Sequence, residues 1–415
     1  MLLSPKRRLL AAALTTALVL GVGSVALSTR VEAAAAASAA QVTAVTPQVS
    51  RPATRTTVFN DPWSTRTSAQ NRITDLQIGL INSAPRGAAV TLATYSISDS
   101  RVVNALVKAH RRGVKVRVLV DDHGTYQATK ALRAKLGTKQ SARSFVVSCR
   151  YACASDHTYP TADGKGVTRP YQHSKFLAVS KAGSSTYVTV IPSGNLTAAA
   201  VNAQANDALV TRNDKLLYDF LLGRFDALRV DPNNPAATHD AVTSGPTSLT
   251  QYPMVLPAGE KVGRSHDPYY QQFGELDCSA GGSVKVAMAM WSRPRRYLAQ
   301  QLAGMAEKGC EVTIIGDPNT WGAEIRADLA GTKVKIRRVD GSEGDIMHSK
   351  IVIIDGHTAD GRRVHSVTAG SPNWLHQSLY YNDELGFTTS DAAVVASYEA
   401  HLDGLLTKRS KAVRL

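Results

Sequence analysis

The chain contains 415 residues, more than one ordinary hydrophobic core holds, so its length predicts two domains or two fused repeats. Hydrophobic residues make up 43% and charged residues 20% of the chain, which excludes an intrinsically disordered protein. The formal net charge of +15 favours an anionic partner, either phospholipid headgroups or nucleic acid, although a basic surface can also serve only solubility.

The chain begins with the pattern of a secretory signal peptide. Lys6, Arg7 and Arg8 precede an apolar stretch over residues 9–27, and small residues follow it. We expect cleavage within residues 33–40 and secretion of the protein. An uncleaved membrane anchor is the alternative, because the apolar stretch is long for a signal peptide. Residues 1–40 are assigned to this segment and residues 41–57 to a flexible arm.

The remainder of the chain contains two copies of one sequence pattern. Residues 88–99 resemble residues 283–294, and each segment is a β-rich run followed by a helical pattern. The two predicted helices end at Gly113 and Gly309, and glycine is a common residue just past a helix. The later matches, in chain order, are 114–122 with 310–318, 173–180 with 348–355, 188–197 with 365–374, and 206–214 with 382–391.

Strands alternate with helices early in each copy, which predicts an α/β fold made of two pseudo-symmetric sheet-and-helix halves. We place the halves at residues 58–230 and 256–410, with a linker at 231–255 that is rich in Pro, Asn, Ser and Thr. Two copies are too few for a solenoid, so a pseudo-dimer with one shared interface is favoured. Such an interface brings equivalent residues together, and we expect the active site in the cleft between the halves.

The best-conserved match between the two copies is an octapeptide, "HSKFLAVS" at 173–180 and "HSKIVIID" at 348–355. Residues i and i+2 of a strand point to the same face, so His173 and Lys175 project together, as do His348 and Lys350. The same spacing recurs in a second pair of segments, where it joins Ser193 to Asn195 and Ser371 to Asn373.

This set of side chains suits the cleavage of a phosphodiester. Two lysines and two asparagine amides can bind the phosphate oxygens, where negative charge develops in the transition state. One imidazole can attack phosphorus while the other protonates the departing alkoxide. We expect no metal or other cofactor, because the lysines supply the charge stabilisation.

A nucleophilic imidazole needs a partner that orients its other nitrogen. Asp207 lies 12 residues after Asn195, and Glu384 lies 11 residues after Asn373. We assign both acids as partners of the histidines, with Asp383 as the rival of Glu384.

The sequence resembles the phospholipase D superfamily over roughly residues 57–410. The mark of that superfamily is His-x-Lys-x4-Asp followed by a Gly/Ser-x-Asn segment. "HSKIVIID" and "GSPN" (370–373) match it fully, and "HSKFLAVS" and "PSGN" (192–195) match it except at Ser180. The resemblance implies that His173 is the nucleophile, that His348 is the general acid, and that Lys175 and Lys350 bind phosphate.

Ser180 stands where the second copy has Asp355. Asp355 lies five residues past Lys350, so it points to the opposite face of a straight strand from His348. We expect Asp355 to cap a turn at 355–356 and Ser180 to be a structural replacement. The alternative is a degenerate first copy in a protein that only binds its ligand.

Three further residues lie near the expected site. Tyr95 and Trp291 end matched strands and are predicted to contact the substrate, with packing beneath the site as the alternative for both. His123 follows a strand beside two aspartates and is a weaker candidate for the pocket wall.

The four cysteines predict two disulfides in a secreted chain. Local pairing, Cys149 with Cys153 and Cys278 with Cys310, is the simplest arrangement, although three connectivities are open. A zinc site is disfavoured because no Cys-x-x-Cys pair is present.

Together these features predict a secreted, monomeric phospholipase D-type phosphodiesterase that hydrolyses phospholipids to phosphatidate and a headgroup alcohol. A nuclease with the same chemistry and a non-catalytic phosphate- or lipid-binding protein are the alternatives. Headgroup preference is expected to depend on loops such as 154–170.

Overall fold

The structure is a computed structural model that describes residues 51–123, 126–154, 159–160, 167–230, 234, 238–254, 263–339 and 346–415. Ser50–Leu415 form one compact unit. The predicted signal peptide and the first part of the predicted arm lie outside the described residues, as does most of loop 154–170. Within the part of the chain that the structure describes, no helix is long and apolar enough to cross a membrane.

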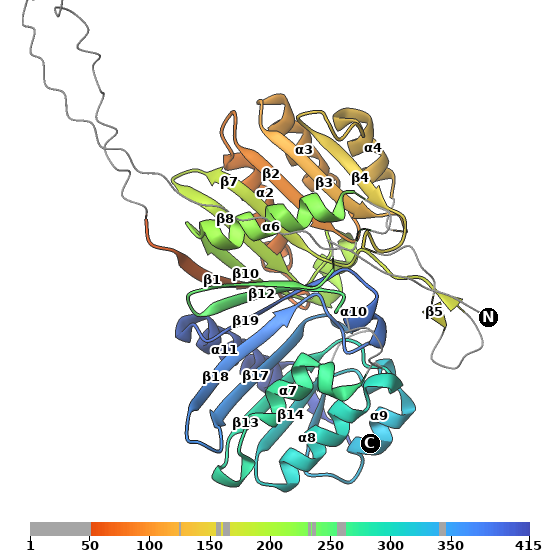
Figure 1. Cartoon of the computed structure of the whole chain (residues 1–415), viewed down its shortest axis with the longest axis vertical. Coiled ribbons are helices and arrows are strands. Elements are labelled where there is room, and N and C mark those ends of the chain that lie inside the picture. The colour runs from red at the N-terminus through yellow and green to blue at the C-terminus, as the bar shows by residue number, and fades with distance from the viewer. Residues whose placement is uncertain are drawn as a thin grey trace, which may run out of the picture. The chain divides into compact units, whose positions relative to one another are not determined.

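The N-terminal half contains a seven-stranded sheet with the order β1-β10-β8-β7-β2-β3-β4 (Figure 1). Its elements are β1 (Thr54–Phe59), α1 (Thr67–Gln70), α2 (Arg72–Ser83), β2 (Ala89–Thr94), α3 (Ser100–Arg111), β3 (Lys115–Asp121), α4 (Gln127–Leu136), β4 (Phe145–Cys149), β5 (Tyr159–Pro160), β6 (Val167–Thr168), β7 (Phe176–Ala182), β8 (Ser185–Pro192), α5 (Ala198–Asn202), β9 (Gln204–Ala205), β10 (Asp207–Arg212) and α6 (Lys215–Leu228).

The C-terminal half contains a nine-stranded sheet with the order β11-β12-β19-β18-β17-β13-β14-β15-β20. Its elements are β11 (Asp240–Ser244), β12 (Thr247–Tyr252), η2 (Arg264–His266), α7 (Pro268–Gly274), η3 (Cys278–Ala280), β13 (Ser283–Met288), η4 (Arg293–Arg295), α8 (Tyr297–Glu307), β14 (Glu311–Gly316), η5 (Pro318–Thr320), α9 (Ala323–Leu329), β15 (Lys335–Val339), β16 (Ile346–Met347), β17 (Lys350–His357), β18 (Arg363–Gly370), α10 (His376–Tyr380), β19 (Glu384–Thr389), α11 (Ala392–Lys408) and β20 (Ser410–Ala412).

The two sheets repeat one strand order. The order β1-β10-β8-β7-β2-β3-β4 matches β12-β19-β18-β17-β13-β14-β15, and the second sheet adds β11 and β20 at its edges. The duplicated α/β fold predicted from the sequence is therefore confirmed. Two boundaries were wrong: the predicted arm already forms strand from Thr54, and much of the predicted linker is the β11–β12 hairpin, which extends the second sheet.

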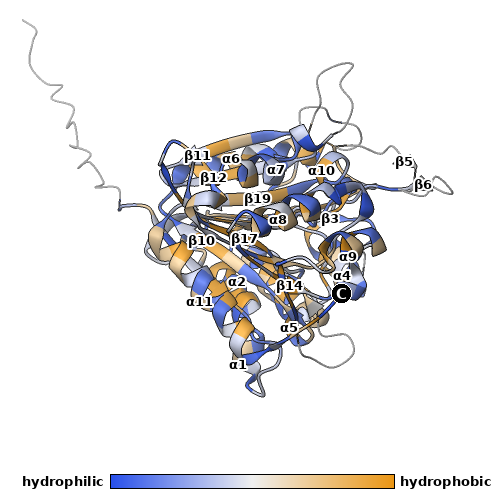
Figure 2. Cartoon of the chain, turned by 90° about the horizontal axis from the view of Figure 1, so that it is seen from below, coloured by the Kyte–Doolittle hydropathy of each residue, from blue (hydrophilic) through white to orange (hydrophobic). Residues whose placement is uncertain are grey.

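Nearly continuous runs of buried residues in central strands such as β2, β7 and β17 let each sheet bury both faces. One core cluster contains residues of both sheets together with the inward faces of α6 and α11, so it joins the halves. Two further clusters pack each sheet against its outer helices, α2 to α4 in the first half and α7 to α9 in the second. Figure 2 shows the result, with hydrophobic colour concentrated on inner strands such as β17 and β14.

The glycines and disulfides predicted from the sequence are found in the structure. Gly113 (φ 92°) and Gly309 (φ 116°) follow α3 and α8 in the left-handed region, where a side chain would be strained. Both predicted disulfides are present. Cys149 is bonded to Cys153 with a Cα–Cα distance of 5.0 Å, and Cys278 to Cys310 with 4.8 Å.

Candidate active site

Each histidine motif pairs with the opposite half of the chain. The His173 amide donates to the Asp383 carbonyl at 2.8 Å, and the His348 amide donates to the Ala205 carbonyl at 3.0 Å. Short parallel pairings accompany these bonds, Gln172 with Asp383 and β16 with β9. This reciprocal exchange brings both motifs to the interface between the halves, as the duplicated sequence predicted.

His173 is oriented by a carboxylate of the other half. Its Nδ1 lies 2.7 Å from Glu384 Oε2, and Glu384 is fully buried. Glu384 also accepts a hydrogen bond from Ser371 Oγ at 2.5 Å and one from Asn382 Nδ2 at 3.2 Å. The carboxylate is thus held in one orientation, with Nδ1–H of His173 as its donor, so that Nε2 is the nitrogen that can act on a ligand. The predicted pairing of a histidine with Glu384 is observed, and Asp383 is not that partner.

His348 is oriented by an amide, Asn206, which the sequence interpretation missed. Nδ1 of His348 lies 2.8 Å from Asn206 Oδ1. The amide is itself fixed, because Asn206 Nδ2 donates to the carbonyls of Ala200 and Gln204, both at 3.0 Å. Asn206 Oδ1 must therefore accept, so His348 carries its proton on Nδ1 when the ring is neutral.

The assignment of Asp207 as a histidine partner was wrong. Its carboxylate is fully buried and accepts a hydrogen bond from Tyr398 Oη at 2.7 Å. The cause is the strand register. Ser193 N donates to the Asp207 carbonyl, as Ser371 N donates to the Leu385 carbonyl, so Asp207 corresponds to Leu385. One step back, Asn206 corresponds to Glu384, and a shift by one residue moves a side chain to the other face.

Lys175 and Lys350 hold matched positions beside the histidines. Lys175 is 1% exposed and Lys350 is fully buried, and each ammonium donates to the carbonyl of the histidine two residues earlier, at 2.7 and 2.5 Å. Burial lowers the pKa of Lys175 to about 7 and that of Lys350 to about 8, although Glu384 opposes both shifts. A bound phosphate would restore the charge of both lysines, so the pair fits an anion.

The shared environment shifts the pKa values of the two histidines unequally. Burial lowers the pKa of both, but Glu384 raises the pKa of His173 in part. The pKa of His348 is lowered well below its usual range by burial and then by the charges of Lys350, Lys175 and His173. The four side chains therefore form one electrostatic cluster, and among its described hydrogen bonds the one from His173 to Glu384 is the bond to a carboxylate.

Ser193 and Ser371 are buried, as the two lysines are, and their predicted contact with the substrate stays a prediction. Each bonds the residue that orients a histidine, Ser193 Oγ to Asn206 Oδ1 at 3.2 Å and Ser371 Oγ to Glu384. They are positioning residues.

Asn195 and Asn373 follow β8 and β18, where the two polypeptide segments approach the motifs. Asn373 is 7% exposed, and the side-chain oxygens of both asparagines have no hydrogen-bond partner among the described residues. Their predicted role in binding phosphate stays a prediction.

Tyr95 and Trp291, the two aromatic residues predicted near the site, lie in different environments. The half-buried Tyr95 ring lies 5.8 Å from the His173 ring and 5.8 Å from that of Tyr171, so it remains a candidate for contact with the substrate. Trp291 is 1% exposed and its ring lies 4.5 Å from that of Trp374, so its predicted contact with the substrate was wrong.

The error at Trp291 arose from a register shift of two residues. Trp291 bridges Trp374, whereas Ile97 bridges Leu196, and these bridges occupy equivalent positions in the two halves. Trp291 therefore corresponds to Ile97 and not to Tyr95. An apolar residue at this position packs into the outer core in both halves.

Ser180 and Asp355 are equivalent strand residues outside the catalytic cluster. Ser180 Oγ accepts a hydrogen bond from the Ala89 amide at 2.8 Å, and Asp355 forms an ion pair with Arg363. The turn expected at 355–356 is absent from this described segment, because β17 continues to His357. Both residues are structural, as predicted for Ser180.

A buried arginine, also missed, supports the second asparagine loop. Arg295 is 1% exposed and bonds the fully buried Asp267 through two nitrogens, at 2.8 and 2.9 Å. Its third nitrogen donates to the Asn373 carbonyl at 3.1 Å. The signal available in the sequence was only a basic run, "SRPRR", which does not distinguish buried from exposed arginines.

His123 lies at the edge of the same region. Its ring lies 5.2 Å from that of Tyr171, and its Nδ1 lies 2.9 Å from the buried Asp121. It is exposed and ends the row of rings that starts at His173 and continues through Tyr95 and Tyr171.

The chain was compared with known families and structures. The family described as "Cardiolipin synthase, PLD-like domain" matches residues 78–227 and 278–406, more than half of the chain. No curated protein matches the sequence significantly. The two matched segments correspond to the two halves of the fold.

Solved structures support the same architecture. Phosphatidylserine synthase of Haemophilus influenzae Rd KW20 has a TM-score of 0.54 at 11% identity, covering 83% of this chain and 86% of that one. Polyphosphate kinase of Porphyromonas gingivalis has a TM-score of 0.52 at 14% identity, covering 85% of this chain. This chain spans only 50% of the kinase chain. At these identities the similarity establishes the fold.

Proposed function

Since the chain belongs to the family described as cardiolipin synthase, PLD-like domain, whose superfamily includes phosphodiesterases, we propose that it cleaves phospholipids to phosphatidate and a headgroup alcohol. The observation that carries this proposal is the pair of histidines whose Nδ1 atoms are held by residues of the opposite half, beside two buried lysines. With both Nδ1 atoms engaged, the Nε2 atoms are the ones that can act on a ligand, and Nε2 of His348 lies 3.5 Å from Lys350 Nζ. The ligand that two ammonium groups favour is a phosphate.

The reaction follows from the difference between the two histidines. Bound phosphate raises the pKa of His348, so its ring enters the reaction protonated on both nitrogens. Nε2 of His173 attacks phosphorus, the bond from phosphorus to the headgroup oxygen breaks, and Nε2 of His348 gives that oxygen its proton. Glu384 stabilises the positive charge that develops on the phosphorylated ring. Water then enters, His348 takes its proton, the oxygen bonds phosphorus and the bond to His173 breaks. The two steps add one water and restore both rings.

Two comparisons favour a lipid over a nucleic acid as the substrate. The matched family is described as cardiolipin synthase, PLD-like, and one structural neighbour is a phosphatidylserine synthase. The net charge of +15 fits an anionic lipid surface and fits nucleic acid equally, so the choice rests on the two comparisons. We further propose secretion, because two disulfides and the N-terminal pattern fit an oxidising compartment.

The test presents both substrates to the purified protein. Phosphatidylcholine and phosphatidylglycerol vesicles, and separately plasmid DNA, are incubated with wild type, His173→Ala and His365→Ala in excess EDTA. We expect phosphatidate from wild type and from the His365→Ala control, none from His173→Ala, and phosphatidylethanol when ethanol is added. Cleavage of DNA with no phosphatidate from any common phospholipid would replace the lipid by nucleic acid.

A further inference from the structure

Asp383 is a buried carboxylate beside the catalytic cluster that the chemistry above does not use. It precedes Glu384 in the chain and is fully buried. Its backbone pairs with the first histidine motif, donating to the Tyr171 carbonyl at 3.0 Å and accepting from the His173 amide at 2.8 Å. A single residue of the second half therefore contacts the backbone on both sides of Gln172.

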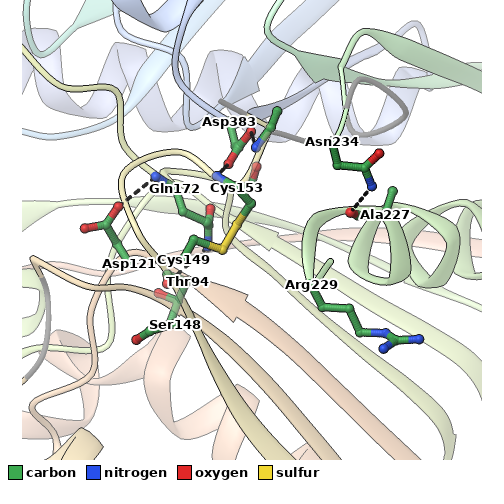
Figure 3. Close-up of a disulfide and its surroundings, with 12 residues drawn as sticks. Thr94, Asp121, Ser148, Cys149, Cys153, Gln172, Ala227, Arg229, Asn234 and Asp383 are labelled. Atoms are coloured by element: carbon green, nitrogen blue, oxygen red, sulfur yellow. Dashed lines mark hydrogen bonds between the residues drawn. A yellow bond between two sulfur atoms is a disulfide. The ribbon is translucent and has the colours of Figure 1, made fainter. Parts of the chain in front are cut away.

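The Asp383 carboxylate binds a second segment of the first half. It accepts hydrogen bonds from the backbone amides of Cys153, at 2.5 Å, and Ala154, at 3.2 Å. Figure 3 shows the carboxylate against this loop, with the Cys149–Cys153 disulfide beneath it. Because the disulfide joins the end of β4 to Cys153, the two amide donors are anchored to the sheet of the first half.

Among the described residues, the other histidine has no such arrangement. Ala205 accepts from the His348 amide as Asp383 accepts from the His173 amide, so Ala205 is its equivalent and lacks a carboxylate. The segment that follows β15, residues 340–345, contains no cysteine. The carboxylate and the cross-linked loop thus occur together, and only on the side of His173.

Asp383 also lies in an unfavourable environment. Burial raises its pKa well above the usual range, and the charges of Asp121 and Glu384 add to this effect, while the two amide donors oppose it. An apolar residue at this interface would avoid the cost of burying a carboxylate. Two backbone donors aimed at one carboxylate are a specific positional constraint, and its nearest catalytic consequence is the placement of Glu384 and His173.

We propose that Asp383 is a positioning residue for His173, and that the Cys149–Cys153 disulfide holds the loop that fixes it. The inference rests on the proposed phosphodiesterase function. Asp383 fixes the backbone on both partners of the His173–Glu384 hydrogen bond, which is 2.7 Å long. Loss of the constraint would let the attacking nitrogen move away from its line of approach, and such displacements are costly in rate.

The experiment removes the Asp383 carboxylate and, separately, the Cys149–Cys153 disulfide, with the Cys278–Cys310 disulfide as the control. Asp383→Ala, Asp383→Asn, Cys149→Ser with Cys153→Ser, and the control Cys278→Ser with Cys310→Ser are assayed with bis(p-nitrophenyl) phosphate. The second readout is the low-field proton NMR signal of His173 Nδ1–H, identified by its loss in His173→Ala. We expect Asp383→Ala to lower kcat roughly 10- to 100-fold with little change in KM and to shift this signal. Asp383→Asn, which retains one acceptor, should recover part of both.

The loop and the carboxylate should act as a unit. Removing Cys149 and Cys153 should lower kcat and shift the same signal, and combining this change with Asp383→Ala should add little, because both changes break the same contact. The Cys278–Cys310 control should leave the signal in place and combine additively with Asp383→Ala.

An unshifted signal with wild-type kcat in Asp383→Ala would overturn the proposal, and so would additive effects of the first disulfide and Asp383. If wild type hydrolysed no phosphodiester, the proposed function would fail, but the NMR signal would still decide whether Asp383 and the loop position His173. If Asp383→Ala did not fold, Asp383→Asn and the cysteine variants would provide the same comparison.

Discussion

The two halves of this protein present the same histidine with different partners. His173 faces the carboxylate of Glu384, whereas His348 faces the amide of Asn206, at nearly equal distances of 2.7 and 2.8 Å. A carboxylate stabilises a positive imidazole, but an amide only fixes its orientation. The fold is therefore symmetric in geometry and asymmetric in charge, and the carboxylate lies beside the ring that, in the proposed reaction, becomes positive when its Nε2 bonds phosphorus.

The largest expected effect separates the two roles. His173→Ala should abolish turnover of every substrate, whereas His348→Ala should lower phospholipid turnover roughly 10²–10⁴-fold. A p-nitrophenolate leaving group needs no proton, so His348→Ala should still release a burst of one p-nitrophenol per enzyme from bis(p-nitrophenyl) phosphate. Stopped-flow absorbance measures this burst. A burst in His173→Ala and none in His348→Ala would reverse the assignment.

The second-largest effect is expected from removing the negative charge of Glu384 beside His173. Glu384→Gln should lower kcat roughly 10²–10³-fold, because the cation that develops on His173 loses its counter-charge. Attack requires unprotonated Nε2, so activity falls as the pH drops through the pKa of His173. The carboxylate raises that pKa, and its loss should move the acidic limb of the pH–rate profile to lower pH. An unmoved acidic limb would show that His173 does not control it.

The converse change adds a charge on the other side. Asn206→Asp should raise the pKa of His348, which must be protonated to act as the acid, so the basic limb of the kcat profile should move to higher pH. The rate at the optimum should change by less than about tenfold, because the orienting oxygen remains. Asp207→Asn is the matched variant, since its carboxylate bonds Tyr398 and should not affect the basic limb. Equal shifts in both variants would restore Asp207 as the partner.

Much of this site could be predicted from the sequence, because repetition and strand periodicity constrain it strongly. The histidines, the lysines and Glu384 lie where the duplicated motif places them, and the cysteines pair locally. The errors at Asp207 and Trp291 have one origin. Similar letters, "NDAL" and "NDEL", align Asn206 with Asn382, two residues away from Glu384, its equivalent in the backbone pairing. Trp291 was likewise matched two residues away from its equivalent. Only hydrogen bonds reveal the true register.

Other features depend on contacts between distant segments. Arg295 reaches Asp267 and the Asn373 carbonyl across 28 and 78 residues, and no local pattern predicts such a contact. Asn206 carries no catalytic signature as a residue type. Its role appears only when Ser193, His348 and two carbonyls are found around one amide.

The smallest expected effect concerns the residue that first distinguished the two motifs. Asp355 pairs with Arg363 at a half-exposed position, while Ser180 accepts a hydrogen bond from the Ala89 amide and contacts Tyr218. Ser180→Asp would introduce the aspartate of the superfamily motif. It would also place a carboxylate beside Tyr218 without an arginine partner equivalent to Arg363. We expect it to cost about 1 kcal/mol in the free energy of unfolding, measured in urea, and Asp355→Ser to cost less than about 1 kcal/mol, because exposed ion pairs contribute little.

Neither change should alter kcat by more than about twofold. Ser180, on β7, and Asp355, on β17, both lie away from the histidines and lysines. The two variants together test whether the aspartate of the His-x-Lys-x4-Asp motif has a catalytic role. A large gain in kcat from Ser180→Asp, with stability unchanged, would mean that the first motif is catalytically impaired by its serine. The asymmetry that matters would then lie in β7, and the partners of the two histidines would no longer account for the difference between the halves.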